Sequence, residues 1–151
     1  MADLRLEELS AKNVEAANNL TLKPGQEQFI APVSYAMADP FITPGTSWSR
    51  VVVDENDTVL GFIMAVFDPE AVEEEFRSCI WRMNVSAESQ GAGVGRFAVE
   101  ETAAEARRRG FERLTVLWEP GEPGPEEFFL RVGFTVVGES QYGEKIGAIT
   151  L

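Results

Sequence analysis

A glycine-rich segment at residues 85–97, VSAESQGAGVGRF, holds the residue types and spacing that most directly suggest chemistry. Its glycines, Gly91, Gly93 and Gly95, stand between an apolar run and a second run with helical spacing. One interpretation is structural, because a tight strand-to-helix turn needs the backbone freedom of glycine. The other is functional, because a glycine-rich loop that opens a helix presents bare backbone N–H groups to an anion.

The spacing of this loop favours anion binding. Successive N–H groups from Gly91 to Arg96 can converge on one concave spot at the positive end of the following helix. A pyrophosphate fits such a nest, because missing Cβ atoms let phosphates come close and Arg96 can add a charge-assisted contact. Neither GxGxxG in its dinucleotide setting nor GxxxxGK(S/T) occurs, which excludes those two nucleotide-binding loops.

Bulk composition narrows the class of function. A chain of 151 residues with 44% hydrophobic and 25% charged residues predicts one compact domain, residues 1–151. The net charge of −12 argues against nucleic-acid binding, which needs a positive surface; an acidic surface attracts cations such as polyamines, although acidity also serves solubility. Histidine is absent, which removes the commonest general base and the commonest zinc ligand, and we expect no metal site.

Cysteine usage and the N-terminus bear on the cellular setting. Cys79 is the single cysteine, so no internal disulfide can form and a reducing cytoplasm fits. The start MADLRLEELSA lacks a basic residue followed by an apolar run, and the apolar stretch GFIMAVF is too short to span a bilayer. We therefore expect a cytoplasmic chain with no signal peptide and no membrane partner.

The elements that must position the glycine loop alternate in type. A strand at 4–9 precedes a helix at 14–22, with Ser10 and Asn13 as candidate caps. Residues 23–47 carry four prolines and predict short helices and loops that form a lid facing the ligand. The later segments predict a hairpin at 48–67, a strand at 77–85, a helix from 95 to Gly110, a strand at 112–118, a short helix ending at Gly133 and a closing hairpin at 135–151. This order favours an antiparallel front with one strand–helix–strand crossover behind.

Together these features resemble the GNAT superfamily of acyl-CoA-dependent N-acetyltransferases. Gln90, Gly93 and Gly95 match the family signature Q/R-x-x-G-x-G/A, and the likeness extends over nearly the whole chain to the GF at 133–134. The segment QEQFIAPVSYAMADPF and the FDPE at 67–70 further resemble bacterial spermine/spermidine acetyltransferases. The resemblance implies an α/β (α+β) fold: a mixed, mostly antiparallel twisted sheet of six to seven strands, about four helices and a splayed central strand pair.

The resemblance also implies how acetyl-CoA, the co-substrate, is held. Pantetheine would lie as a pseudo-strand between the fourth and fifth strands, beside a bulge in the fourth strand that leaves backbone groups unpaired. The pyrophosphate would sit on the glycine loop. The predicted cofactor-binding residues are Met83, Asn84, Val85, Gln90, Gly91, Gly93, Val94, Gly95, Arg96 and Phe129.

The implied reaction is direct attack of an amine on the thioester, which needs a proton acceptor for the amine and a proton donor for the sulfur. In many relatives a tyrosine four residues before the GF glycine is the donor; here that position is Phe129, and the asparagine often found in the preceding turn is absent. Tyr35 or Tyr142 could replace it, or water could suffice because a free thiol has a pKa of about 8.5. The remaining alternative is that the protein binds acyl-CoA without turning it over.

Acceptor-side residues follow from the same reasoning. The motif strand IWRMNV carries no carboxylate, so the base would act through water, from Glu27 in the lid or Asp68 after the hairpin, although both are also typical of solvated loops. Arg82 stands in an apolar strand and must either form an ion pair or point into the active cleft. The predicted substrate-binding residues are Gln28, Phe29, Asp68, Trp81 and Arg82.

The sequence therefore predicts an acetyl-CoA-dependent N-acetyltransferase for a primary amine of a small cationic acceptor, with polyamines the leading class. The alternatives are a non-catalytic acyl-CoA-binding module and an acetyltransferase for an amine antibiotic or a peptide amine. We expect no nucleic-acid partner, and the family's habit of dimerising makes a homodimer an expectation of the resemblance alone.

Overall fold

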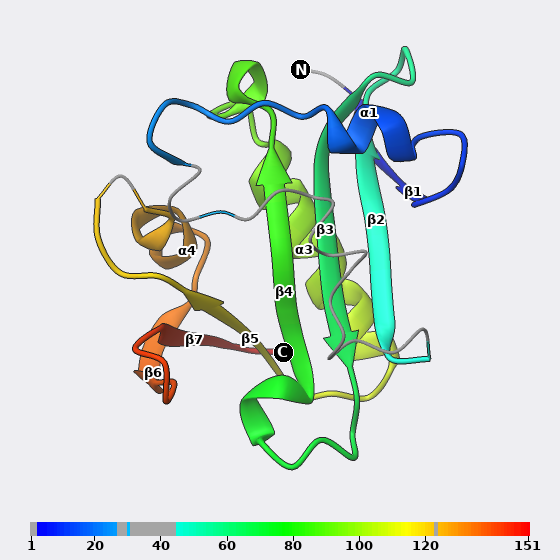
Figure 1. The fold of residues 1–151 in the computed structure, drawn as a ribbon. Helices are drawn as coiled ribbons and strands as arrows, with labels where there is room; N and C mark the ends of the chain where they lie inside the picture. Colours follow the sequence, from blue (N-terminus) through cyan, green and yellow to red (C-terminus); the bar gives the residue numbers. More distant parts are fainter. Residues whose placement is uncertain (1–2, 27–29, 31–44, 123) are drawn as a thin grey trace.

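A computed structural model describes residues 3–26, 30, 45–122 and 124–151 of the chain. They form a seven-stranded sheet with the strand order β1-β2-β3-β4-β5-β7-β6 (Figure 1). All neighbouring strands are antiparallel except β4 and β5, which are parallel. This confirms the predicted mixed, mostly antiparallel sheet. The strands are β1 (Arg5–Glu8), β2 (Ser47–Val53), β3 (Val59–Phe67), β4 (Ser78–Val85), β5 (Arg113–Trp118), β6 (Thr135–Glu139) and β7 (Lys145–Thr150).

The described helices are few and mostly short: α1 (Val14–Asn18), α3 (Val94–Arg108), α4 (Glu126–Arg131) and the 3₁₀ helices η2 (Glu74–Phe76) and η3 (Ala87–Ser89). The helix predicted at 14–22 ends at Asn18, where the N–H of Asn19 already bonds the carbonyls of Glu15 and Ala16. Asparagine has a much lower helix propensity than alanine, so the pair Asn18-Asn19 favours an end at this point. Most of the predicted lid at 23–47 lies outside the described residues.

The β2–β3 hairpin shows why this sequence forms strands. Val52 and Ile63 belong to the core on one face of the sheet, whereas Val51 and Phe62 belong to the core on the other. Alternate side chains of a strand point to opposite faces, so an apolar run of β-branched and aromatic residues forms a strand that is buried on both sides. The turn between the strands is closed by Asp54, whose carboxylate accepts N–H bonds at 2.9 and 3.0 Å.

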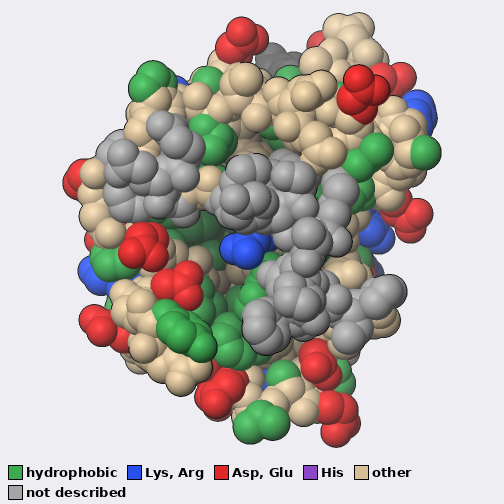
Figure 2. All heavy atoms as spheres, in the orientation of Figure 1, with side chains coloured by type: hydrophobic (Ala, Val, Ile, Leu, Met, Phe, Trp, Pro, Cys, Tyr) green, Lys and Arg blue, Asp and Glu red, His purple; other side chains and the backbone are tan. Residues whose placement is uncertain are grey.

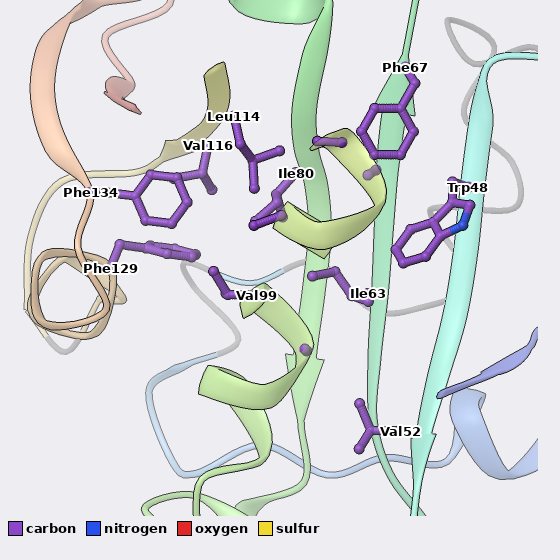
Figure 3. Close-up of a cluster of buried hydrophobic side chains, with 14 of the residues drawn as sticks. Trp48, Val52, Ile63, Phe67, Ile80, Val99, Leu114, Val116, Phe129 and Phe134 are labelled. Atoms are coloured by element: carbon purple, nitrogen blue, oxygen red, sulfur yellow. The ribbon is translucent and has the colours of Figure 1, made fainter. Parts of the chain in front are cut away.

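The larger core lies between the sheet and α3, which Figure 1 shows behind the strands. The sides of α3 that face the sheet are small or branched and repeat at helical spacing: Val94, Ala98, Val99, Ala103 and Ala106. Figure 3 shows Val99 among side chains of the sheet and of the segment around α4, including Ile63, Ile80, Val116 and Phe129. The smaller core, on the opposite face, joins α1 to β2 and β3 through Ala17, Val51, Val53, Phe62 and Met64.

The crossover β4–α3–β5 brings the motif loop and the open part of the sheet together. The helix ends as predicted at Gly110, where φ is +89° and the next N–H, of Phe111, bonds the carbonyl of Ala106 at 3.0 Å. The second predicted stop, Gly133, has φ +118°, and the N–H of Phe134 returns to the carbonyl of Phe129. These two stops turn the chain back toward the sheet after each helix.

Candidate functional site

The parallel strands β4 and β5 pair over a short length only. Their register consists of Cys79 opposite Thr115 and Ile80 opposite Val116, and Figure 1 shows the two strands diverging beyond that point. The part of β4 from Trp81 to Val85 therefore has no β5 ladder along one edge. A strand that has lost its neighbour along one edge is the kind of element along which an extended ligand can lie.

The β4 strand also carries a bulge, as the family resemblance implies. Met64 of β3 pairs with Arg82 and Ala65 pairs with Ile80, so Trp81 is the extra residue. The segment expected to be left unpaired by the bulge, 83–85, is fully paired with β3. Its open edge results from the divergence of β5, which is a property of the two strands rather than of the bulge.

Gly91 and Gly93 give the motif loop the conformation that the sequence predicts. Both have φ between +85° and +89°, and Gly93 is the residue that precedes α3. A Cβ atom built on either glycine would meet nothing within 4 Å, so the space above the loop is open. The first intrahelical N–H bond is that of Phe97 to Gly93, so the preceding N–H groups, those of 94–96, lack an intrahelical acceptor at the positive end of α3.

Gly95 and Arg96 each contact the α4 region in the structure. A Cβ on Gly95 would lie 2.8 Å from Cζ of Phe128, so this glycine lets α3 approach α4, and its contact with the cofactor stays a prediction. Arg96 donates to the carbonyl of Arg131 at 3.4 Å and pairs with Glu100 at 3.8 Å, and its side chain is half exposed. Its guanidinium lies at the C-terminal end of α4, and its contact with a phosphate stays a prediction.

Gln90, the first residue of the signature, holds the glycine loop in place through hydrogen bonds of its side chain. Its amide donates to the carbonyl of Val85 at 3.0 Å and exchanges hydrogen bonds of 2.8 Å with the amide of Gln26. These bonds join the end of β4, the motif loop and the segment that leads into residues 27–44. In the structure Gln90 holds the loop in place, and its contact with the cofactor stays a prediction.

The short helix α4 is held against the end of β5 by an aromatic stack, a hydrogen bond and an ion pair. Phe129 is buried, with 4% of its surface exposed, and stacks on Trp118 with ring centroids 5.4 Å apart. Glu126 accepts a hydrogen bond from Trp118 at 3.2 Å and pairs with Lys145 at 2.8 Å, and Lys145 lowers the pKa of this carboxyl. Phe129, predicted to contact the cofactor, is thus a core residue here.

Charged side chains lie near the diverging part of β4 and β5, on the face of the sheet that packs against α1 rather than α3. Trp81 packs against the smaller core and meets Phe76 edge-on, with the two ring centroids 5.5 Å apart. The Arg82 guanidinium lies 5.9 Å from the Trp81 ring centroid. Figure 2, viewed from this side, shows acidic side chains over the region of β5, β7 and α4 and a basic patch near the middle of the face. The face therefore offers both signs of charge beside the bulge.

Glu144 is the acidic residue that sequence reasoning missed. It is half-buried one residue before β7, and burial raises the pKa of its carboxyl. The negative charge of Glu119 raises this pKa further, whereas the positive charge of Arg82 opposes the shift. The sequence contains 25 acidic residues, and Glu144 lies in QYGEKIG, a segment with the composition of an ordinary turn. No local signal therefore distinguishes Glu144 from the other acidic residues.

Two other predicted side chains lie in loops. Asp68 follows β3 at the end where Phe67 pairs with Ser78, and its carboxylate accepts the N–H of Glu70 at 3.0 Å, which gives it a local turn role. Tyr142 stands in the β6–β7 turn with 81% of its surface exposed. The predicted residues Glu27, Gln28, Phe29 and Tyr35 lie outside the described residues.

Cys79 is inert in this fold. Its side chain is fully buried, and burial raises the pKa of the thiol to about 12, so no thiolate forms near neutral pH. Within residues 3–26, 30, 45–122 and 124–151, no group of three or more cysteine or acidic side chains is placed to hold a metal ion. In the same part of the chain no helix has the length and apolar character needed to cross a membrane.

Comparison with known proteins gives a family. A sequence model of the acetyltransferase (GNAT) family matches residues 15–134. A curated relative, a mycothiol acetyltransferase from Jonesia denitrificans, is 26% identical over 102 residues, which cover 68% of this chain and 31% of that protein. The chain thus spans about a third of the length of this relative.

Solved structures share the whole fold. The PaiA N-acetyltransferase from Thermoplasma acidophilum, solved with coenzyme A, superposes with a TM-score of 0.70 at 11% identity and covers 99% of both chains. A nourseothricin acetyltransferase gives a TM-score of 0.70 at 18% identity over 97% of this chain and 98% of that one. At these identities the similarity is one of fold, and it confirms the fold that the sequence predicts.

Proposed function

The chain belongs to the acetyltransferase (GNAT) family, whose members use acetyl-CoA as co-substrate, and from that premise we propose that it transfers the acetyl group to a primary amine of a small cationic acceptor, with polyamines as the leading class. The observation that carries the proposal is the stretch of β4 from Trp81 to Val85, from which β5 has diverged and with which it forms no ladder. It starts at the bulge and ends beside the glycine loop, so one extended ligand can meet both.

The residues of this chain fit a ligand that is anionic at one end and extended in its middle. The space above Gly91 and Gly93 and the N–H groups at the start of α3 suit a diphosphate. The edge of Met83, Asn84 and Val85 supplies backbone donors and acceptors along a pantetheine arm. The acetyl group would then lie near the bulge at Trp81, where the acceptor amine attacks the thioester carbon from the opposite face of the sheet.

The cationic acceptor is supported by charge. The net charge is −12, and the negative charge of Glu119 raises the pKa of the nearby Glu144 carboxyl. An acidic surface raises the local concentration of a polycation. The relatives compared above carry names that refer to different acceptors, so the acceptor class rests on this chain's own side chains.

Release of free thiol from acetyl-CoA tests the proposal. Spermidine, spermine and putrescine should support turnover, and lysine peptides and a neutral amine of similar length should support much less. The variant Gly93→Glu places a carboxylate in the proposed diphosphate nest and strains a residue with φ +89°, so it should abolish binding of CoA. Activity on peptides alone would reject the polyamine acceptor, and unchanged CoA affinity in Gly93→Glu would reject the loop assignment.

The proton donor to sulfur is tested in the same assay. Phe129 is buried in an aromatic stack and cannot donate a proton, which is the observation that favours a non-catalytic acyl-CoA-binding module as the second candidate function. Loss of turnover in Tyr35→Phe or Tyr142→Phe would identify the donor, and retention in both would indicate water. CoA binding without thiol release across all amines would favour the binding module.

The proposal extends to cellular setting and assembly, where the family resemblance is the support. It assigns the chain a cytoplasmic location, a single domain over residues 1–151 and a homodimeric state. Cell fractionation, limited proteolysis and sedimentation velocity respectively would test these three statements. A monomer at micromolar concentration would contradict the last of them.

A further inference from the structure

The position of Glu144 follows from strand register. Lys145 of β7 is opposite Trp118 of β5, so Glu144 and Glu119 are the next residues outward on the two strands and come opposite each other. Trp118 belongs to the core that faces α3, and side chains alternate along a strand. Glu119 and Glu144 therefore project from the other face of the sheet, the face on which Trp81 packs.

Glu144 also stands at the level of the bulge. Cys79 is opposite Thr115 and Ile80 is opposite Val116, so Trp118, two residues farther along β5, is level with Arg82, and its partner on β7 is Lys145. Glu144 comes directly before Lys145, and its negative charge interacts with Arg82 and with the buried Cys79 on β4, although β5 lies between the two strands. The half-buried carboxylate is therefore on the face of the sheet that carries the bulge, at the height where β5 no longer pairs with β4.

We propose that Glu144 is the group that takes the proton from the acceptor ammonium. The inference rests on the proposed function. The ammonium gives one proton to the Glu144 carboxylate, directly or through one water, and the freed lone pair forms the N–C bond with the thioester carbon. The C–S bond breaks with its electron pair on sulfur, and the second N–H proton of the intermediate ends on the thiolate. Glu144 then returns its proton to solvent.

Other charged groups in the region suit this role less well. Asp68 is committed to the N–H of Glu70 at the far end of the β3–β4 pair, and Lys145 is paired with Glu126 at 2.8 Å. Within the described part of the chain, the charged groups that act on Glu144 are Glu119 from the end of β5 and Arg82 from β4, while Cys79 remains a neutral thiol. A half-buried carboxyl with a raised pKa is a better base near neutral pH than a fully solvated one.

The test compares Glu144→Gln with Glu139→Gln, which removes the same charge from an exposed position on β6. Glu144→Gln should lower kcat for spermidine by on the order of 10²-fold or more, with CoA affinity and folding unchanged. Glu139→Gln should keep wild-type kcat. Wild-type kcat in Glu144→Gln, or an equal loss in both variants, would overturn the inference.

The pH profile separates a base from a structural residue. The negative charge of Glu119 raises the pKa of Glu144, so Glu119→Gln should move the acidic limb of the kcat profile to lower pH. The limb should disappear in Glu144→Gln. An acidic limb that stays in place in Glu119→Gln would contradict the assignment even if Glu144→Gln fails to fold. A wild-type protein that acetylates no amine would instead reject the proposed function, and this inference with it, whereas an active Glu144→Gln rejects the inference alone.

Discussion

Gly91 and Gly93 differ from Gly95 in what their missing side chains do. The first two take positive φ angles below open space, whereas Gly95 has ordinary backbone and gives its side-chain volume to the ring of Phe128. The same sequence pattern therefore combines an open loop with a helix–helix contact. The spacing of the glycines predicts the loop, but it contains nothing that separates these two uses.

The packing role of Gly95 predicts a stability effect. In Gly95→Ala the new Cβ would lie 2.8 Å from Phe128, so the ring must move and the free energy of unfolding should fall by about 1–3 kcal/mol. Gly138→Ala is the matched control, because a Cβ there meets nothing within 4 Å. Urea unfolding of the two variants measures the difference. Equal stabilities would show that α3 and α4 do not pack as closely as described.

Glu144 should cost stability at neutral pH. Its pKa is raised in the folded state, so the folded protein holds this proton more tightly than the unfolded chain. The stability that this bound proton contributes is therefore lost as pH rises from the ordinary carboxyl pKa of about 4.3 through the raised pKa of the folded state. Glu144→Gln should gain stability relative to wild type across that rise, and the difference should vanish at lower pH. Thermal unfolding over pH 4–8 measures it, and a difference that is independent of pH would contradict the shift.

At the scale of elements, the strands and the main helix could be predicted from sequence because their patterns are local. The apolar run VLGFIMAVF and the glycine at 110 mark β3 and the end of α3 without help from the rest of the chain. The bulge at Trp81 and the position of Glu144 level with it depend on how three strands are placed beside one another. Such relations join residues far apart in sequence, so the sequence indicates Glu27 and Asp68 as candidate bases and contains no signal for Glu144.

Phe129 supplies the buried aromatic contact by which α4 packs on the sheet. A helix of six residues is too short to be stable alone, so its packing through Phe129 on Trp118 must hold it. Phe129→Ala should lower the free energy of unfolding by about 3–5 kcal/mol, whereas Leu130→Ala on the exposed side should cost less than about 1 kcal/mol. Chemical denaturation of both variants tests this. Similar losses in the two would show that α4 is held by something other than the stack.

The protein as a whole is acidic, and its two proposed substrates have opposite charges. Acetyl-CoA is anionic and must reach a loop whose attraction is local, from helix N–H groups and open backbone. A polyamine is drawn by the whole surface as well as by Glu119 and Glu144. The long-range field of the protein therefore attracts the polyamine and repels acetyl-CoA. Only the local N–H groups at the start of α3 attract the phosphates of CoA.

This opposition predicts salt effects of opposite sign. Raising ionic strength from about 0.02 M to about 0.3 M shortens the screening length to below about 10 Å and removes most of the long-range field of the −12 charge. The value of kcat/KM for spermidine should then fall by roughly tenfold, while the KM for acetyl-CoA should fall or stay level because repulsion is relieved. A neutral amine acceptor should show little change in kcat/KM. Initial rates at several salt concentrations, with each substrate varied in turn, measure all three. A parallel loss for spermidine and the neutral amine would mean that salt acts on the fold or on CoA binding, and the charge-based assignment of the acceptor would fail.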